Sequence, residues 1–178
     1  AVNGATISNV TIAGSMKFDN QSNVDAGALA GVKVGGDMSL TAVTFSTGIE
    51  YESTNRDNYV HAGGVFGSMS GAGSLKIGSR ESPLNIKANI VSKATEKAPE
   101  RGTACVGGAV GYVDGGCVPS DAGKTVEVDG LIISGSIVIN YGSVKTYAGG
   151  FIGKISQGKA DLTSVKQVEI TKLDFVNF

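Results

Sequence analysis

The sequence predicts an all-β fold, a right-handed parallel β-helix or solenoid of about four coils with three strands each. Three observations lead to this prediction. Glycine accounts for 27 of the 178 residues, and runs of helix-favouring residues are scarce. A glycine-rich hexapeptide recurs along the chain. Stretches with apolar or small residues at every second position flank its copies, and this is the period of a strand with one buried face.

The hexapeptide has the pattern small-Gly-Gly-apolar-apolar-Gly. It reads AGGVFG at 62–67, VGGAVG at 106–111 and AGGFIG at 148–153, and AGALAG at 26–31 is a looser copy. Successive copies lie 36, 44 and 42 residues apart, a scatter that loops of unequal length explain. No copy has the spacing of a phosphate-binding loop. We interpret the hexapeptides as a structural wall whose small residues let opposite sides of a narrow coil approach.

A long alternating stretch precedes each copy, and its middle position is small. The stretches cover Val10 to Phe18, Val43 to Tyr51, Leu84 to Ile90 and Leu131 to Ile139. In the second stretch the alternation slips by one residue after Phe45, which predicts a β-bulge there. Each stretch is expected to form the longest strand of its coil.

A shorter alternating stretch follows each copy. Its apolar pairs are Met38 and Leu40, Leu75 and Ile77, Val126 and Val128, and Val168 and Ile170. Together these segments indicate one repeat domain over residues 1–178, with units of roughly 1–24 (partial), 25–61, 62–105, 106–147 and 148–178 (partial). A β-sandwich of hairpins is the alternative fold, because DGG at 114–116 is a hairpin signal.

Composition excludes several functions. The 15 basic residues balance the 16 acidic ones, so no basic surface for nucleic acid or an anionic membrane is expected. The sequence contains no run of about 18 apolar residues, so no transmembrane segment is predicted. With one histidine and two cysteines, the chain has too few ligands for a metal site, and we expect no cofactor and no catalytic set. Cys105 and Cys117 either form one disulfide bond or are two small buried apolar residues.

The loops that join each long stretch to the next hexapeptide are the most variable part of the repeat. They should leave the same edge of the coil and form one rim, and insertions on one side often mark a binding face. Aromatic and hydrogen-bonding side chains gather there. The candidate ligand-binding residues are Tyr51, Arg56, Asn58, Tyr59, His61, Arg101, Tyr141, Lys145 and Tyr147.

The segments GGVFGSMSGAGSLKI (63–77) and GGAVGYVDGGCV (107–118) resemble the GLUG motif of bacterial surface and secreted proteins. The first copy departs from that motif, since Ala28 replaces the second glycine of its head. The resemblance implies a bacterial protein that is secreted or on the cell surface. It further implies a non-enzymatic adhesin-like or spacer module, whose partners would be a host glycan or an extracellular protein.

Two further expectations concern partners and chemistry. The outer coils of a solenoid carry unpaired strand edges, so we expect further repeats or self-association at the open ends. The alternative function is a polysaccharide-active enzyme, a lyase or hydrolase, because such enzymes also use parallel β-helices. Against it, the candidate acidic residues Asp37, Asp114, Asp161 and Glu127 fall in turns or outward positions and are spread over three units.

Overall fold

The computed structural model describes residues 1–20, 23–53, 59–70, 73–94, 102–114, 126–140, 145–156 and 168–177. Within these ranges the secondary structure is β-strand and no helix occurs, so none is present to cross a membrane. The strands are β1 (Ala5–Ser8), β2 (Thr11–Asn20), β3 (Val24–Gly27), β4 (Ala30–Lys33), β5 (Met38–Thr41), β6 (Thr44–Ser53), β7 (Tyr59–Gly63), β8 (Phe66–Met69), β9 (Leu75–Ile77), β10 (Leu84–Ala94), β11 (Thr103–Gly107), β12 (Val110–Val113), β13 (Val126–Val128), β14 (Leu131–Asn140), β15 (Lys145–Gly149), β16 (Ile152–Ile155) and β17 (Val168–Asn177).

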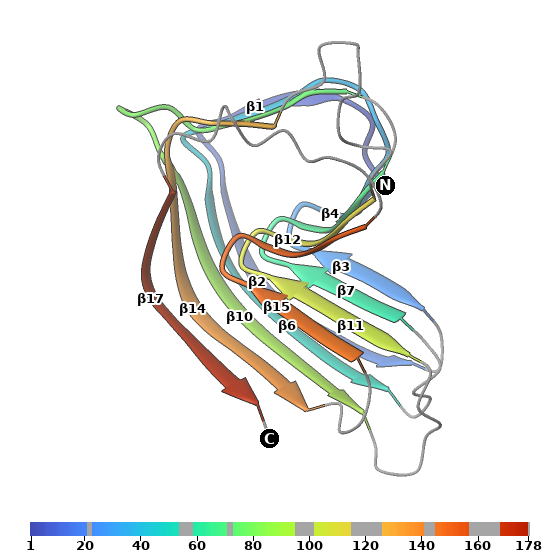
Figure 1. Ribbon diagram of the computed structural model, residues 1–178. Helices are drawn as coiled ribbons and strands as arrows, with labels where there is room; N and C mark the ends of the chain where they lie inside the picture. Colours follow the sequence, from blue (N-terminus) through green and yellow to red (C-terminus); the bar gives the residue numbers. More distant parts are fainter. Residues whose placement is uncertain are drawn as a thin grey trace.

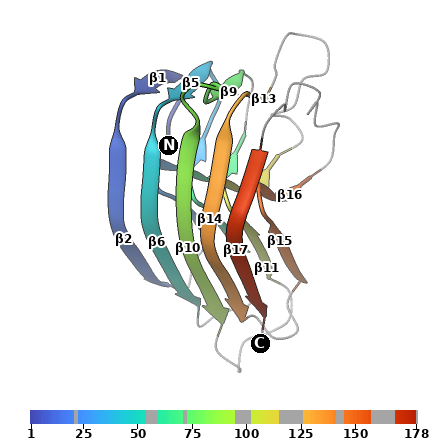
Figure 2. The ribbon, with the colours of Figure 1, turned by 90° about the vertical axis from the view of Figure 1, so that its left-hand side faces the viewer.

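The strands stack into four parallel sheets, which confirms the parallel β-helix (Figure 1). The long-strand sheet has the order β17-β14-β10-β6-β2, and Figure 2 shows it face on. The short-strand sheet is β1-β5-β9-β13. The other two sheets, β15-β11-β7-β3 and β16-β12-β8-β4, we call the first and second walls. Because every pairing between described strands is parallel, the sandwich of hairpins is wrong.

Each complete coil contains four strands, where the sequence predicted three. The difference lies in the hexapeptide, which was expected to be one strand. In the second copy, β7 ends at Gly63 and β8 begins at Phe66, and the chain bends between them. A Cβ atom at Gly63 would overlap the carbonyl oxygen of Phe66. The bend therefore depends on glycine, and it sends the chain from the first wall into the second (Figure 1).

The bends stack through backbone hydrogen bonds. The amide of Val65 donates to the carbonyl of Ala109 over 2.9 Å, and the amide of Ala109 donates to that of Phe151 over 3.0 Å. The tip of each bend also packs against the middle of the long-strand sheet. A Cβ atom at Gly64 would lie 2.5 Å from Cγ2 of Ile86. The small middle position of the long strands thus makes room for the bend of the hexapeptide.

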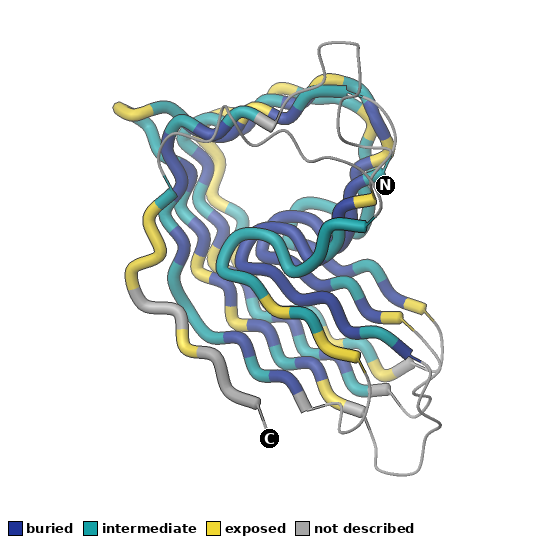
Figure 3. The backbone as a smooth tube through the Cα atoms, in the orientation of Figure 1, coloured by how far each residue is buried: buried dark blue, intermediate teal, exposed yellow. Residues whose placement is uncertain are grey.

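The core lies between the long-strand sheet and the other three sheets (Figure 3). Its rows run from strand to strand in register, and one of them places Phe45, Ile86 and Ile133 side by side. The predicted bulge after Phe45 is wrong, because β6 pairs with β10 without a shift. Thr47 occupies the inward position at which the alternating pattern has no apolar residue, and it is 5% exposed.

The last strand differs from its predicted place. Val168 and Ile170 were expected to extend the short-strand sheet, but they pair with Leu131 and Ile133 of β14. They therefore begin the fifth strand of the long-strand sheet, and a bulge at Thr171 shifts the register by one residue further along β17. The sequence pattern had aligned Val168 with Val126, about five residues before its observed partner Leu131.

Candidate binding groove

The first and second walls diverge from the hexapeptide bend (Figure 1). Their outward faces enclose a groove of about 470 Å³. Glycines at the bend bring the two backbones close together. A Cβ atom at Gly67, on β8, would overlap the backbone of Ala26 on β3. The groove is lined by Asp25, Val32, Tyr59, His61, Ser68, Met69, Ser70, Thr103, Cys105, Tyr112, Asp114 and Lys154.

Two rows of side chains run along the groove, one on each wall. The residues immediately before the four hexapeptides form the first row, which is Asp25, His61, Cys105 and Tyr147. The residues immediately after them form the second row, which is Val32, Ser68, Tyr112 and Lys154. Parallel pairing in register brings these residues, about 40 positions apart in sequence, to adjacent strands. No two members of either row are of the same residue type.

Three aromatic rings stack across the groove. The ring of Tyr59 lies 4.5 Å from that of His61, with 16° between their planes. The other side of the His61 ring stacks on Tyr112, with 4.3 Å between centroids and 8° between planes. Tyr59 and His61 belong to the first wall and Tyr112 to the second, so the stack joins the two walls. Tyr59 is 37% exposed and presents its ring at the groove opening.

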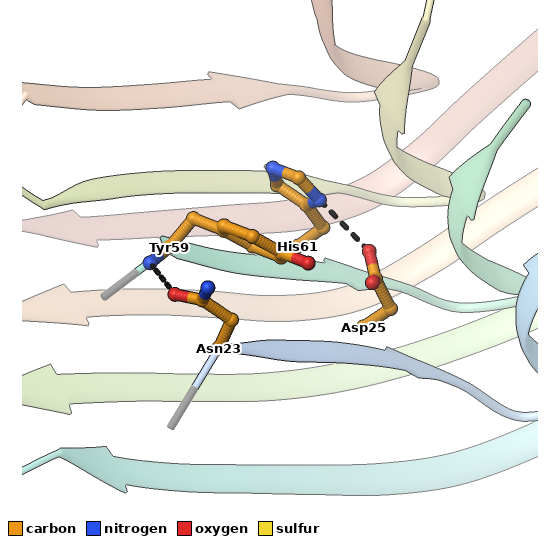
Figure 4. Close-up of polar contacts among 4 residues, drawn as sticks. All are labelled: Asn23, Asp25, Tyr59 and His61. Carbon is orange, nitrogen blue, oxygen red and sulfur yellow. Dashed lines mark hydrogen bonds and ion pairs between the residues drawn. The ribbon is translucent and has the colours of Figure 1, made fainter. Parts of the chain in front are cut away.

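Asp25 orients this stack from the neighbouring strand β3. Its Oδ1 lies 2.8 Å from Nδ1 of His61, and both side chains are more than four-fifths buried (Figure 4). The backbone amide of Tyr59 donates to Oδ1 of Asn23 over 2.9 Å. Burial raises the pKa of the Tyr59 hydroxyl, and the charge of Asp25 and a hydrogen bond to it raise it further. Tyr59 therefore stays neutral at physiological pH.

Cys105 follows Asp25 and His61 in the first row, and together they have the residue types of a nucleophilic triad. The thiol is free and its residue is fully buried. Burial raises the pKa of Cys105 to about 11, and the nearby Lys154 charge lowers it only in part. The thiol is therefore protonated at neutral pH and is a poor nucleophile. In the described part of the chain, no three His, Cys, Asp or Glu residues are grouped as metal ligands.

The structure brings some of the predicted rim residues together and separates others. Tyr59 and His61 lie in the groove, Tyr147 continues the first row, and Lys145 is exposed at the start of β15. The prediction for Tyr51 is wrong, because its side chain is fully buried in the core. Four further candidates, Arg56, Asn58, Arg101 and Tyr141, lie outside the described residues, as does Cys117.

Sequence reasoning missed Asp25, Tyr112 and Lys154 as groove residues. A signal for them was present, since aligning the hexapeptides places these residues directly before or after a copy. The missing step was the bend, which turns the two flanking positions toward each other. The candidate site is therefore the groove between the walls, and only part of the predicted rim belongs to it.

No known protein family, curated protein or solved structure matches the chain at a significant level. The groove must therefore be interpreted from its own chemistry.

Proposed function

We propose that the chain is a non-enzymatic, extracellular binding module of the adhesin type, and that its groove binds a glycan chain. The observation that supports this proposal is the aromatic stack of Tyr59, His61 and Tyr112 in a concave surface. Flat aromatic rings pack against the apolar faces of sugar rings at little conformational cost. The groove is also open to solvent, as a polymeric ligand requires.

Hydroxyl groups next to the rings fit the same ligand class. Ser68 and Ser70 line the second wall and Thr103 lines the first. Each hydroxyl both donates and accepts, which matches the hydroxyl groups of a sugar. A spacer module without a ligand would need neither the ring stack nor these hydroxyls. The location, secreted or on the bacterial surface, is supported by the resemblance of the hexapeptides to GLUG repeats.

Replacement of Tyr112 by alanine tests the proposal. Tyr112 supplies the only described aromatic ring of the second wall in the groove, and loss of a central aromatic contact weakens binding by about 30-fold or more. The measurement is binding of the wild-type protein and the variant to a glycan array. Lys87→Ala, on the exposed outer face of β10, is the matched control and should bind like the wild type.

The melting temperature of each variant shows whether a loss of binding reflects the groove alone. Tyr112→Ala should remain folded, because the ring is only partly buried. If the wild-type protein binds no glycan, or if Tyr112→Ala binds as well as Lys87→Ala, the proposal is wrong.

A second candidate function, cleavage of a polysaccharide, is favoured by one observation. Asp25 and Asp114 line the groove from opposite walls, and glycoside hydrolysis needs two carboxyl groups on either side of the substrate. This candidate requires release of new reducing ends from a polymer panel by the wild-type protein. Asp114→Asn should then abolish turnover while leaving binding intact, and absence of turnover would exclude it.

The open ends of the coil stack provide a further proposed contact. Among the described strands, β2 and β17 at the edges of the long-strand sheet each pair with one neighbour. We expect their free edges to pair with further repeats or with a second copy. Light scattering over a range of concentrations tests for the second copy.

A further inference from the structure

The groove carries opposite charges at its two ends. Asp25 stands in the first coil, on β3, while Lys145 and Lys154 stand in the fourth, on β15 and β16. Asp25 and Lys145 lie on the first wall and Lys154 on the second, and the first and fourth coils are at opposite ends of both walls, so the difference in charge follows the axis of the coil stack. The charges at the two ends differ in whether they are already compensated within the protein.

The negative charge is already engaged. Asp25 bonds to Nδ1 of His61 over 2.8 Å and also interacts with the hydroxyl of Tyr59. These contacts hold the carboxylate against the first wall, where its side chain is 18% exposed. A ligand would gain little by competing for it, since the carboxylate would first lose its partners.

In the described part of the chain, neither lysine is paired with a carboxylate. Among the described residues, no carboxylate lies within 4 Å of the ammonium group of Lys145 or Lys154. The Lys154 ammonium lies over the ring of Tyr147, 4.3 Å from its centroid. This contact positions the charge at the groove lining without neutralising it.

One acidic group on the same wall limits where an anion can lie. Asp114 lines the groove, and its Oδ1 accepts a hydrogen bond from the Ser156 hydroxyl over 3.2 Å. Both residues lie further from the bend along the second wall than Lys154 does. An anion is therefore favoured on the side of Lys154 that faces the first wall, next to Tyr147.

We propose that this end of the groove is a subsite for the carboxylate of an acidic saccharide, held by Lys154 with Lys145 nearby. The inference rests on the proposed glycan-binding function and specifies the ligand class. A uronic or sialic acid carries its carboxylate directly on the ring. The sugar ring can then pack in the aromatic part of the groove while the carboxylate reaches the ammonium group.

The test compares acidic oligosaccharides with their methyl esters, which have the same sugar rings but lack the negative charge. Matched pairs of galacturonate, glucuronate and sialic-acid oligosaccharides are titrated calorimetrically at neutral pH. We expect the wild-type protein to bind at least one acid about tenfold more tightly than its ester. Lys154→Met retains the apolar stem and should remove that preference. Lys76→Met, which removes an exposed lysine paired with Glu127 away from the groove, should retain it.

The outcomes separate the two proposals. If acid and ester bind equally to the wild-type protein and Tyr112→Ala loses both, the groove binds glycans but the carboxylate subsite is wrong. If Lys154→Met keeps the preference for the acid, the subsite is also wrong. If neither form of any pair binds, the subsite is wrong, and the glycan array then decides separately whether the proposed function fails as well.

Discussion

The core rows and the groove rows follow the same register, yet their residues differ in kind. Across the middle coils, Ile90 is followed by Ile137 in the core, while His61 is followed by Cys105 in the groove. Core positions are enclosed by the other sheets, so they retain an apolar residue of similar volume. Groove positions face outward, and the stacking of the coils does not depend on their identity. A repeat can therefore vary its groove-facing residues from coil to coil without losing its core.

The largest expected effect comes from the bend that separates the two regions. At Gly108 a Cβ atom would overlap the carbonyl of Gly150 and lie 2.7 Å from Cγ2 of Ile133. We expect Gly108→Val to destabilise the protein by at least about 3 kcal/mol, measured by urea denaturation. Gly48→Ala is the control, because its Cβ atom would meet nothing closer than 3.6 Å. Similar stabilities for the two variants would contradict the role given to the bend.

Substitutions on the two faces of β10 test whether burial distinguishes the core rows. Ile90 is 1% exposed and faces the first wall, whereas the next residue, Val91, points outward on the same strand. Ile90→Ala should cost about 3 kcal/mol of unfolding free energy, since it leaves a cavity. Val91→Ala should cost less than about 1 kcal/mol. Equal costs would mean that the two faces of the long-strand sheet are not distinguished by burial.

Cys105 combines both regions, because it lines the groove and is fully buried. Its raised pKa, about 11 against 9.0, means that the folded state keeps the proton more tightly than the unfolded state. The protonated thiol should therefore contribute up to about 2 to 3 kcal/mol to the free energy of unfolding, and this contribution should be lost as the pH rises from 9 to 11. The measurement is the stability of the wild-type protein relative to Cys105→Ala across this range.

Alkylation gives an independent check on the same thiol. In a Cys117→Ser background, iodoacetamide should modify folded Cys105 slowly at pH 8 and modify the denatured protein fast. Fast modification of the folded protein would show an exposed thiolate and would revive the triad interpretation of the first row.

The smallest effect is expected at an exposed contact between coils. The backbone amide and the hydroxyl of Ser74 donate to Oδ1 of Asp37, over 2.8 and 2.7 Å, and lower the pKa of this carboxyl below 3.8. This contribution is present above pH 3.8 and is lost as the pH falls through the folded-state value. The stability advantage over Asp37→Ala should shrink in acid, as thermal melts would show. Ser74→Ala keeps the amide donor and should retain part of the effect.

Alternation along the chain was enough to predict the parallel coils and most of their core. The same alternation also predicts that Tyr51 points inward, because Tyr51 follows Ile49 by two residues and shares its inward face. The assignment of Tyr51 to the rim failed because tyrosine suits both a core and a binding surface. Its spacing of two residues from Ile49 should have assigned it to the core. The fourth strand was missed for another reason. A bend made by glycines leaves the apolar pattern of the hexapeptide unchanged.

The sequence by itself determined the number of coils and the inward rows, because burial between sheets requires an apolar or small residue at every second position of each repeat. Only the tertiary structure decided that Asp25, His61 and Tyr112 meet in one groove. Their meeting depends on how closely two backbones approach at Gly63 and Gly67. The repeated glycines permit this approach, but the pattern of apolar residues does not show that the chain bends between them.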